Sequence, residues 1–231
     1  LLARGRIALA FTFKGRGRDD FQEATRLALE VGDEPLAIEA YARAAFALGT
    51  TGDPDAATAG LPLVEAITRR QGERAAFPRA LLHHNLGTVA LARGERTAAR
   101  AAFERARTET VGLTDDAAIE MMVVLESLMV VADDDDHRSQ FGRELIAQRA
   151  RVLGPNHPHT LEAQLVLGSL LAGREDGRRA LTAPCTTLAE LHPSARQSLL
   201  ECAYDVTWRA AVAGDRAATA AMARRVLAAT S

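Results

Sequence analysis

Residues 83–107 read HHNLGTVALARGERTAARAAFERAR and carry the signals of two packed helices. The pair Leu86–Gly87 lies in the first half, Gly94 interrupts the helical pattern, and Ala99 follows in the second half. Glycine is the usual residue where one helix ends and the chain turns. Small side chains at Gly87 and Ala99 allow the two helix backbones to approach closely. The stretch therefore predicts a helical hairpin that turns at Gly94.

The same stretch resembles the tetratricopeptide repeat (TPR), whose pattern is W-x2-L-G-x2-Y followed by A-x3-F-x2-A. His83 and Ala90 stand where this family prefers Trp and Tyr. Phe103 and Ala106 lie three positions apart, so they share one helical face and can pack on the next hairpin. The positions that match are Leu86, Gly87, Ala99, Phe103 and Ala106.

Weaker copies of these signals occur elsewhere in the chain. Each copy holds a Leu-Gly pair, a glycine turn with an acidic residue after it, or the small residue that follows. The copies are Gly52–Asp53 with Ala57, Leu167–Gly168 with Ala180, and Gly214–Asp215 with Ala218. The chain therefore repeats one helical unit along most of its length.

A connector between two units resembles a particular type of TPR. Residues 152–160 read VLGPNHPHT, which is similar to the LGxxHPxT connector of kinesin-light-chain-type repeats. Units of this type are longer than the 34 residues of the plain repeat, and the spacing here is about 38–43 residues. In bacteria, such repeats commonly occur in multidomain signalling proteins, including Ser/Thr kinases and STAND-type ATPase regulators.

The resemblance implies an all-α fold, a right-handed superhelix (solenoid) of about six TPR-like hairpins. We expect a single repeat domain over residues 1–231 that is a fragment of a longer protein. Pro62 lies inside a predicted second helix, where it should kink the helix. The expected hairpins are residues 1–32, 35–71, 78–110, 115–153, 158–191 and 194–230.

Composition agrees with a helical protein and argues against some partners. The chain of 231 residues is 48% hydrophobic and 4% aromatic, and alanine, the best helix former, supplies about a fifth of it. A formal charge of −2 argues against nucleic-acid binding, which usually needs a basic surface. No apolar run reaches the roughly 18 residues of a membrane span. We therefore expect a cytoplasmic protein that binds neither nucleic acid nor membrane.

The sequence lacks the common motifs of catalysis, cofactor binding and metal binding. The sequence contains no H-E-x-x-H, Walker or G-x-S-x-G pattern, so we expect neither an enzyme nor a cofactor. Adjacent histidines on a helix diverge by about 100°, which disfavours a metal at His83 and His84. We interpret His157 and His159 as connector residues, and residues 133–136, four aspartates, as a solvated loop.

The two cysteines, Cys185 and Cys202, lack the spacing of a metal site and are too few for a disulfide framework. We therefore expect reduced, buried thiols.

A partner-binding groove is the favoured functional site. The resemblance implies that the first helices of successive hairpins line this groove, which receives a peptide. These positions lack the Lys or Arg with Asn that chaperone-binding TPR proteins use to grip a terminal carboxylate. Tyr204 and Trp208 lie four apart and form an aromatic patch, either as an interface anchor or as the end of the core. The predicted groove residues are Phe46, His84, Thr88, Leu91, Met121, Val124, Leu128, Glu162, Leu165, Ser169, Tyr204 and Trp208.

These observations predict a non-catalytic protein-interaction or sensory scaffold. Self-association or an autoinhibitory contact with another part of the same protein is an alternative. A helical enzyme domain is a further alternative, which would require a convergent polar pocket that the sequence does not indicate.

Overall fold

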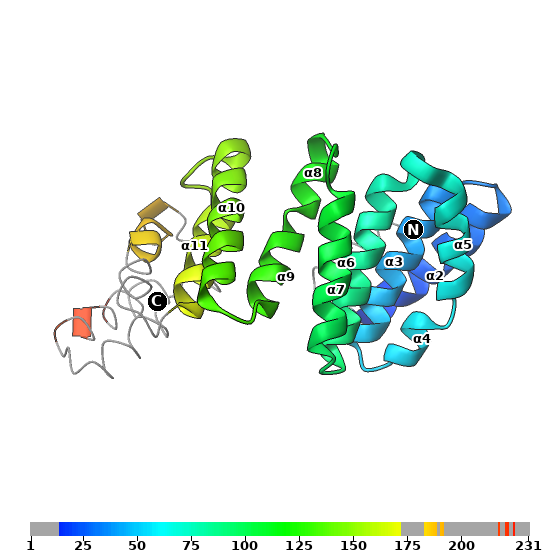
Figure 1. Cartoon of the computed structure of the whole chain (residues 1–231), viewed down its shortest axis with the longest axis horizontal. Coiled ribbons are helices and arrows are strands. Elements are labelled where there is room, and N and C mark those ends of the chain that lie inside the picture. The colour runs from blue at the N-terminus through cyan, green and yellow to red at the C-terminus, as the bar shows by residue number, and fades with distance from the viewer. Residues whose placement is uncertain are drawn as a thin grey trace. The chain divides into compact units, whose positions relative to one another are not determined.

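The computed structural model describes residues 14–171 together with 183–188, 190–191, 217, 220–221 and 224. Within these residues the secondary structure is helical and contains no strand, so the predicted all-α class is confirmed. The chain divides into two compact units, Leu1–Val124 and Leu125–Ser231. The helices (Figure 1) are α2 (Lys14–Glu30), α3 (Glu34–Thr50), α4 (Pro54–Thr58), α5 (Leu61–Gln71), the 3-10 helix η1 (Gly72–Ala75), α6 (Ala76–Ala92), α7 (Arg96–Glu109), α8 (Asp115–Met121), α9 (Val123–Val131), α10 (Asp135–Leu153) and α11 (Pro158–Leu170).

Aspartates begin several of these helices. The carboxylate of Asp33 accepts a hydrogen bond from the backbone N–H of Leu36 at 3.2 Å, and that of Asp53 accepts one from Ala56 at 3.1 Å. Each bond satisfies a backbone N–H that has no partner inside the helix. Pro54 then occupies the first helical turn, where its missing N–H costs nothing. These local signals set the starts of α3 and α4.

Helices α6 and α7 pack side by side as the hairpin predicted from residues 83–107 (Figure 1). The chain turns between them at Gly94, which has a φ of +78°. A Cβ atom added to Gly87 would lie 2.5 Å from Cε1 of Phe103. Gly87 therefore lets α6 rest directly on the Phe103 ring, which is 1% exposed. This contact is the physical reason for the glycine of the Leu-Gly pair. It also packs Phe103 against α6 of its own hairpin, whereas the sequence predicted a contact with the next hairpin.

Alanine-rich helix α3 is the centre of the first unit and packs against α2, α4, α5 and α6. A Cβ atom on Gly49 would lie 2.5 Å from Cγ2 of Val89, so α3 and α6 also approach through a glycine. The Nδ2 of Asn85, on α6, donates a hydrogen bond of 2.9 Å to the carbonyl of Ala42 on α3. Both atoms lie in buried residues, and this polar contact fixes the register between the two helices.

In the expected hairpin over residues 35–71, the second helix is interrupted rather than kinked. Helix α4 ends at Thr58, and α5 begins at Leu61 with Pro62 in its first turn. A Cβ atom on Gly60 would lie 2.9 Å from Cε2 of Tyr41. The Tyr41 hydroxyl donates a hydrogen bond of 3.1 Å to the carbonyl of Ala57, close to the interruption. Pro62 thus starts a new helix, because proline fits a first turn better than a helix interior.

In the second unit, α10 and α11 pack against each other. A Cβ atom on Gly142 would lie 2.6 Å from Cδ1 of Leu167, so a glycine again marks the helix crossing. The connector before α11 is ordered by its own side chains. The ring of His157 caps α11 by accepting from the N–H of His159 at 3.3 Å, and the Thr160 hydroxyl donates to the carbonyl of Gly154 at 2.9 Å.

None of the described helices is both long enough and apolar enough to cross a lipid bilayer.

Candidate partner-binding face

We define the first-helix face as three half-buried side chains on two packed helices, Phe46 on α3 and Thr88 and Leu91 on α6. Thr88 and Leu91 lie three apart on α6, so they share one helical face. The Thr88 hydroxyl donates to the carbonyl of His84 in its own helix at 3.2 Å. The face therefore combines accessible apolar area with a polar atom that is already satisfied.

An ion-pair cluster lies beside Phe46. Arg43, one turn before Phe46 on α3, donates from Nε to Oε1 of Glu39 at 3.0 Å and from Nη2 to Oε1 of Glu120, on α8, at 2.8 Å. The Arg43 and Glu39 side chains are only 11% and 15% exposed, whereas that of Glu120 is 34% exposed. One guanidinium thus holds two carboxylates.

Four predicted groove residues are buried instead of accessible. His84 is 6% exposed, and its ring lies against Phe103 of α7, with the ring centroids 5.5 Å apart. Met121, Val124 and Leu128 are 1–2% exposed. A side chain with so little exposed area has almost none left for a partner to cover. We therefore leave these four residues out of the proposed surface.

The remaining predicted residues belong to the second unit or lie outside the described residues. Glu162, Leu165 and Ser169 are half-buried on α11, and Oε2 of Glu162 lies 2.9 Å from Nδ1 of His159. Tyr204 and Trp208 lie outside the described residues. The structure does not place the two units relative to each other, so it does not bring these residues together with Phe46.

Sequence reasoning missed Arg43, Glu39 and Asn85 as parts of the first-helix region. The four-residue spacing of Glu39 and Arg43 is a readable signal of an ion pair on one helix. The third member, Glu120, is distant in sequence and could not be found in this way. Asn85 would have been recognisable only as a polar residue in the middle of an apolar helix.

The aspartate run has local structural roles. Asp134 caps α10 by accepting from the N–H of His137 at 2.8 Å, and this bond lowers the pKa of the Asp134 carboxyl. Asp135 pairs with Arg138 at 2.8 Å. Across the helices for which the structure gives side chains, no three His, Cys, Asp or Glu residues are arranged to hold a metal ion. Burial lowers the pKa of His83, which favours its neutral form.

The structure agrees with only part of the prediction for Cys185. It is buried, as expected, at 4% exposure, but it is disulfide-bonded rather than reduced. The prediction of a free thiol is therefore wrong for this residue. Cys202 lies outside the described residues.

Comparison with known proteins identifies the architecture. No known family profile matches the chain, and no curated protein is significantly similar to it in sequence. The crystal structure of BtubC (BKLC) from P. vanneervenii matches with a TM-score of 0.70 and 15% sequence identity, over 94% of this chain and 91% of that chain. The fold is a TPR-like helical solenoid.

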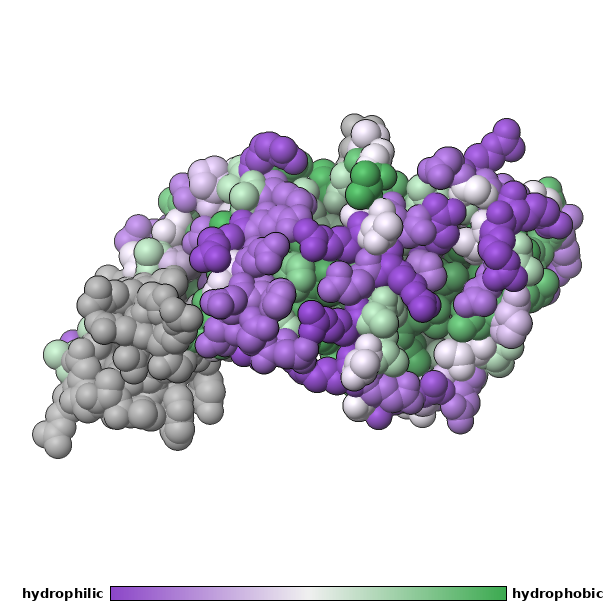
Figure 2. Space-filling view, viewed as in Figure 1, coloured by the Kyte–Doolittle hydropathy of each residue, from purple (hydrophilic) through white to green (hydrophobic). Residues whose placement is uncertain are grey.

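This result confirms the fold that the Leu-Gly pair and the connector predicted, because BtubC is a kinesin light chain-like TPR protein. In Figure 2, hydrophilic residues cover most of the visible face of the described helices, and hydrophobic residues show between them.

Proposed function

We propose that this chain is a non-catalytic scaffold that binds a peptide segment of a partner protein on its first-helix face. The observation that carries the proposal is the pairing of half-buried apolar side chains, Phe46 and Leu91, with a neighbouring ion-pair cluster. Interfaces commonly combine an apolar centre with a polar rim. The TPR-like solenoid supplies the context, since such arrays hold partners along their first helices.

The proposal also includes the class of protein in which this chain acts. The kinesin-light-chain-type connector at residues 152–160 supports a role in a cytoplasmic bacterial signalling protein, such as a Ser/Thr kinase or a STAND-type regulator. Glu162, Leu165 and Ser169 extend the proposed surface within the second unit. Tyr204 and Trp208 are retained as proposed anchors because aromatic side chains contribute strongly to interfaces.

A peptide selection tests this function. Random twelve-residue peptides displayed on phage are selected on the purified chain, and the affinity of the strongest synthetic peptide is measured by calorimetry. Leu91→Glu places a charge on the first-helix face and should weaken binding about tenfold or more. Val111→Glu changes a residue that is 83% exposed in the turn after α7 and should leave the affinity unchanged.

Circular dichroism must show that both variants keep the helical content of the parent. Equal affinities for the two variants would contradict the proposed site. The molar mass of the free chain, measured by light scattering, separates partner binding from self-association. A stable dimer whose formation Leu91→Glu abolishes would assign the same face to a second copy of the chain.

A further inference from the structure

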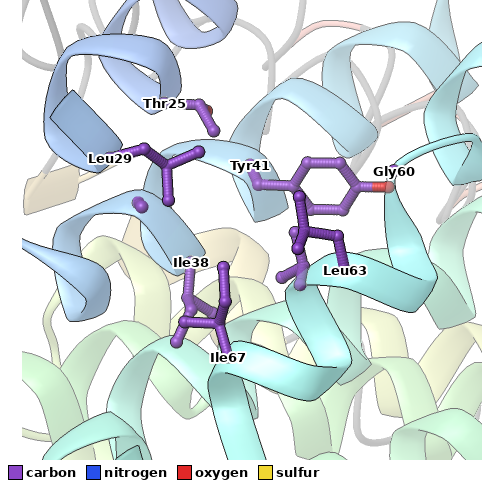
Figure 3. Close-up of a pocket in the computed structure, with 9 residues that line it drawn as sticks. Thr25, Leu29, Ile38, Tyr41, Gly60, Leu63 and Ile67 are labelled. Atoms are coloured by element: carbon purple, nitrogen blue, oxygen red, sulfur yellow. The ribbon is translucent and has the colours of Figure 1, made fainter. Parts of the chain in front are cut away.

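A cavity of about 200 Å³ lies between α2, α3 and α5, away from the first-helix face. Figure 3 shows Leu29, Ile38, Leu63 and Ile67 gathered around it, with the ring of Tyr41 reaching toward Gly60. The interruption between α4 and α5 helps to form this space, because α5 starts anew at Leu61. Leu29 and Leu63 are 40% and 60% exposed, so the cavity opens to solvent between them.

Both hydroxyl groups in the cavity wall already donate a hydrogen bond inside the protein. The Thr25 hydroxyl donates to the carbonyl of Phe21 at 2.9 Å, and the Tyr41 hydroxyl donates to the carbonyl of Ala57 at 3.1 Å. The rest of the wall consists of aliphatic side chains and Gly60. The Thr25 and Tyr41 hydroxyls have thus used their donors, and the wall offers no other side-chain donor to the backbone carbonyls of a peptide.

Several charged residues of the surrounding helices are also paired with one another. Arg26 bonds to Glu23 at 2.6 Å and pairs with Glu30 on α2. Arg70 pairs with Glu34, and Arg69 lies 4.0 Å from Glu65. A charged ligand would lose part of its hydration here, and the charged side chains named above already have partners of opposite charge. These charges therefore favour an uncharged ligand in the cavity.

We propose that this cavity binds a small, uncharged, hydrocarbon-rich molecule, such as a single aromatic ring or a short aliphatic chain. The volume sets the size, because an apolar cavity of about 150 Å³ is sufficient for benzene. The Tyr41 ring and the aliphatic wall supply the contacts. The affinity of so small a ligand is limited by its number of atoms.

The test is a methyl-NMR titration of the purified chain with toluene. The methyl signals of Leu29, Leu63 and Ile67 should shift and saturate, whereas benzoate, the charged counterpart, should not shift them. Thr25→Leu replaces a half-buried wall residue with a larger one and should weaken toluene binding about tenfold or more. Thr58→Leu is the matched control, because Thr58 is a half-buried threonine that does not line the cavity.

A second variant covers the case in which Thr25→Leu disturbs folding. Leu63→Glu puts a charge at the exposed mouth and should also weaken toluene binding, whereas Leu27→Glu, at a leucine 39% exposed and outside the wall, should not. Toluene shifts that do not saturate, or that persist in both cavity variants, would overturn the proposal. Tighter binding of N-acetyl-leucine amide than of toluene would overturn it in favour of a peptide side chain.

Discussion

Arg43 on α3 lies 2.8 Å from Oε1 of Glu120 on α8, although α6 packs against both of these helices. The guanidinium therefore joins the first helices of predicted hairpins that are not neighbours in the chain. Because Arg43 also holds Glu39, its loss leaves the poorly exposed Glu39 and the partly exposed Glu120 without the positive charge that they share. The contact therefore stabilises the packing of the first unit close to Phe46, a residue of the first-helix face.

Replacing Arg43 should test this relationship. We expect Arg43→Met to lower the free energy of unfolding by about 1–3 kcal/mol, which is less than for a fully buried pair because Glu120 is partly exposed. Glu120→Gln keeps an acceptor oxygen and should cost less. Urea unfolding of both single variants and the double variant gives the coupling energy. A coupling energy near zero would show that the ion pair does not contribute to stability.

The contact between Gly87 and Phe103 predicts a clash on substitution. In Gly87→Ala the new methyl group lies 2.5 Å from the ring, and overpacking of this kind costs about 1–3 kcal/mol of unfolding free energy. Phe103→Leu should partly rescue Gly87→Ala in a double-mutant cycle. Gly94→Ala, where a Cβ meets nothing within 4 Å but φ is +78°, should be destabilising without any rescue. Equal rescue of both alanine variants would contradict a specific clash.

Tyr41→Phe removes the hydrogen bond to Ala57 and should lower the free energy of unfolding by about 0.5–1.5 kcal/mol. Burial raises the pKa of Tyr41 above its ordinary value of 10.0. The unfolded chain then loses this proton at a lower pH than the folded chain does, so the parent should lose stability as the pH rises above about 10. Thermal melts at pH 9 to 11 should show a shallower decline for Tyr41→Phe. Parallel pH profiles would exclude this contribution of Tyr41.

In the second unit, the contribution of the Asp134 cap to stability should depend on pH. The hydrogen bond from the His137 N–H lowers the pKa of Asp134 below its ordinary value of 3.8. The carboxylate therefore contributes to stability above that value and stops contributing as the pH falls through the lower folded-state pKa. Asp134→Ala should reduce the melting temperature at pH 7, and the difference from the parent should shrink toward pH 2. A difference that stays constant with pH would contradict the charged cap.

Much of the fold could be predicted because its determinants are local. The turn at Gly94, the small residue at Gly87 and the cap at Asp53 are each readable within one helical hairpin, and each has the expected role. The effect of Pro62 was only partly predictable. Its position disfavours a continuous helix, but the interruption also depends on Gly60 and on the distant Tyr41 ring.

The candidate site was less predictable because exposure depends on packing between distant segments. The repeat pattern placed His84 and Thr88 on the same helix face, yet the Phe103 ring covers His84 while Thr88 keeps part of its surface. The partner of Arg43 on α8 is likewise set by tertiary structure. Periodicity identifies a helix face, but it does not determine which of its residues remain accessible.

Mapping the bound peptide by NMR tests the central claim most directly. The amide and methyl signals of the isotope-labelled chain are recorded with and without the selected peptide. The account predicts that the largest shifts fall on Phe46, Thr88 and Leu91 on the first-helix face, with small shifts on the exposed side of α7. Shifts concentrated on α7, or on α2 and α5 around the cavity, with Phe46 and Leu91 unaffected, would contradict it.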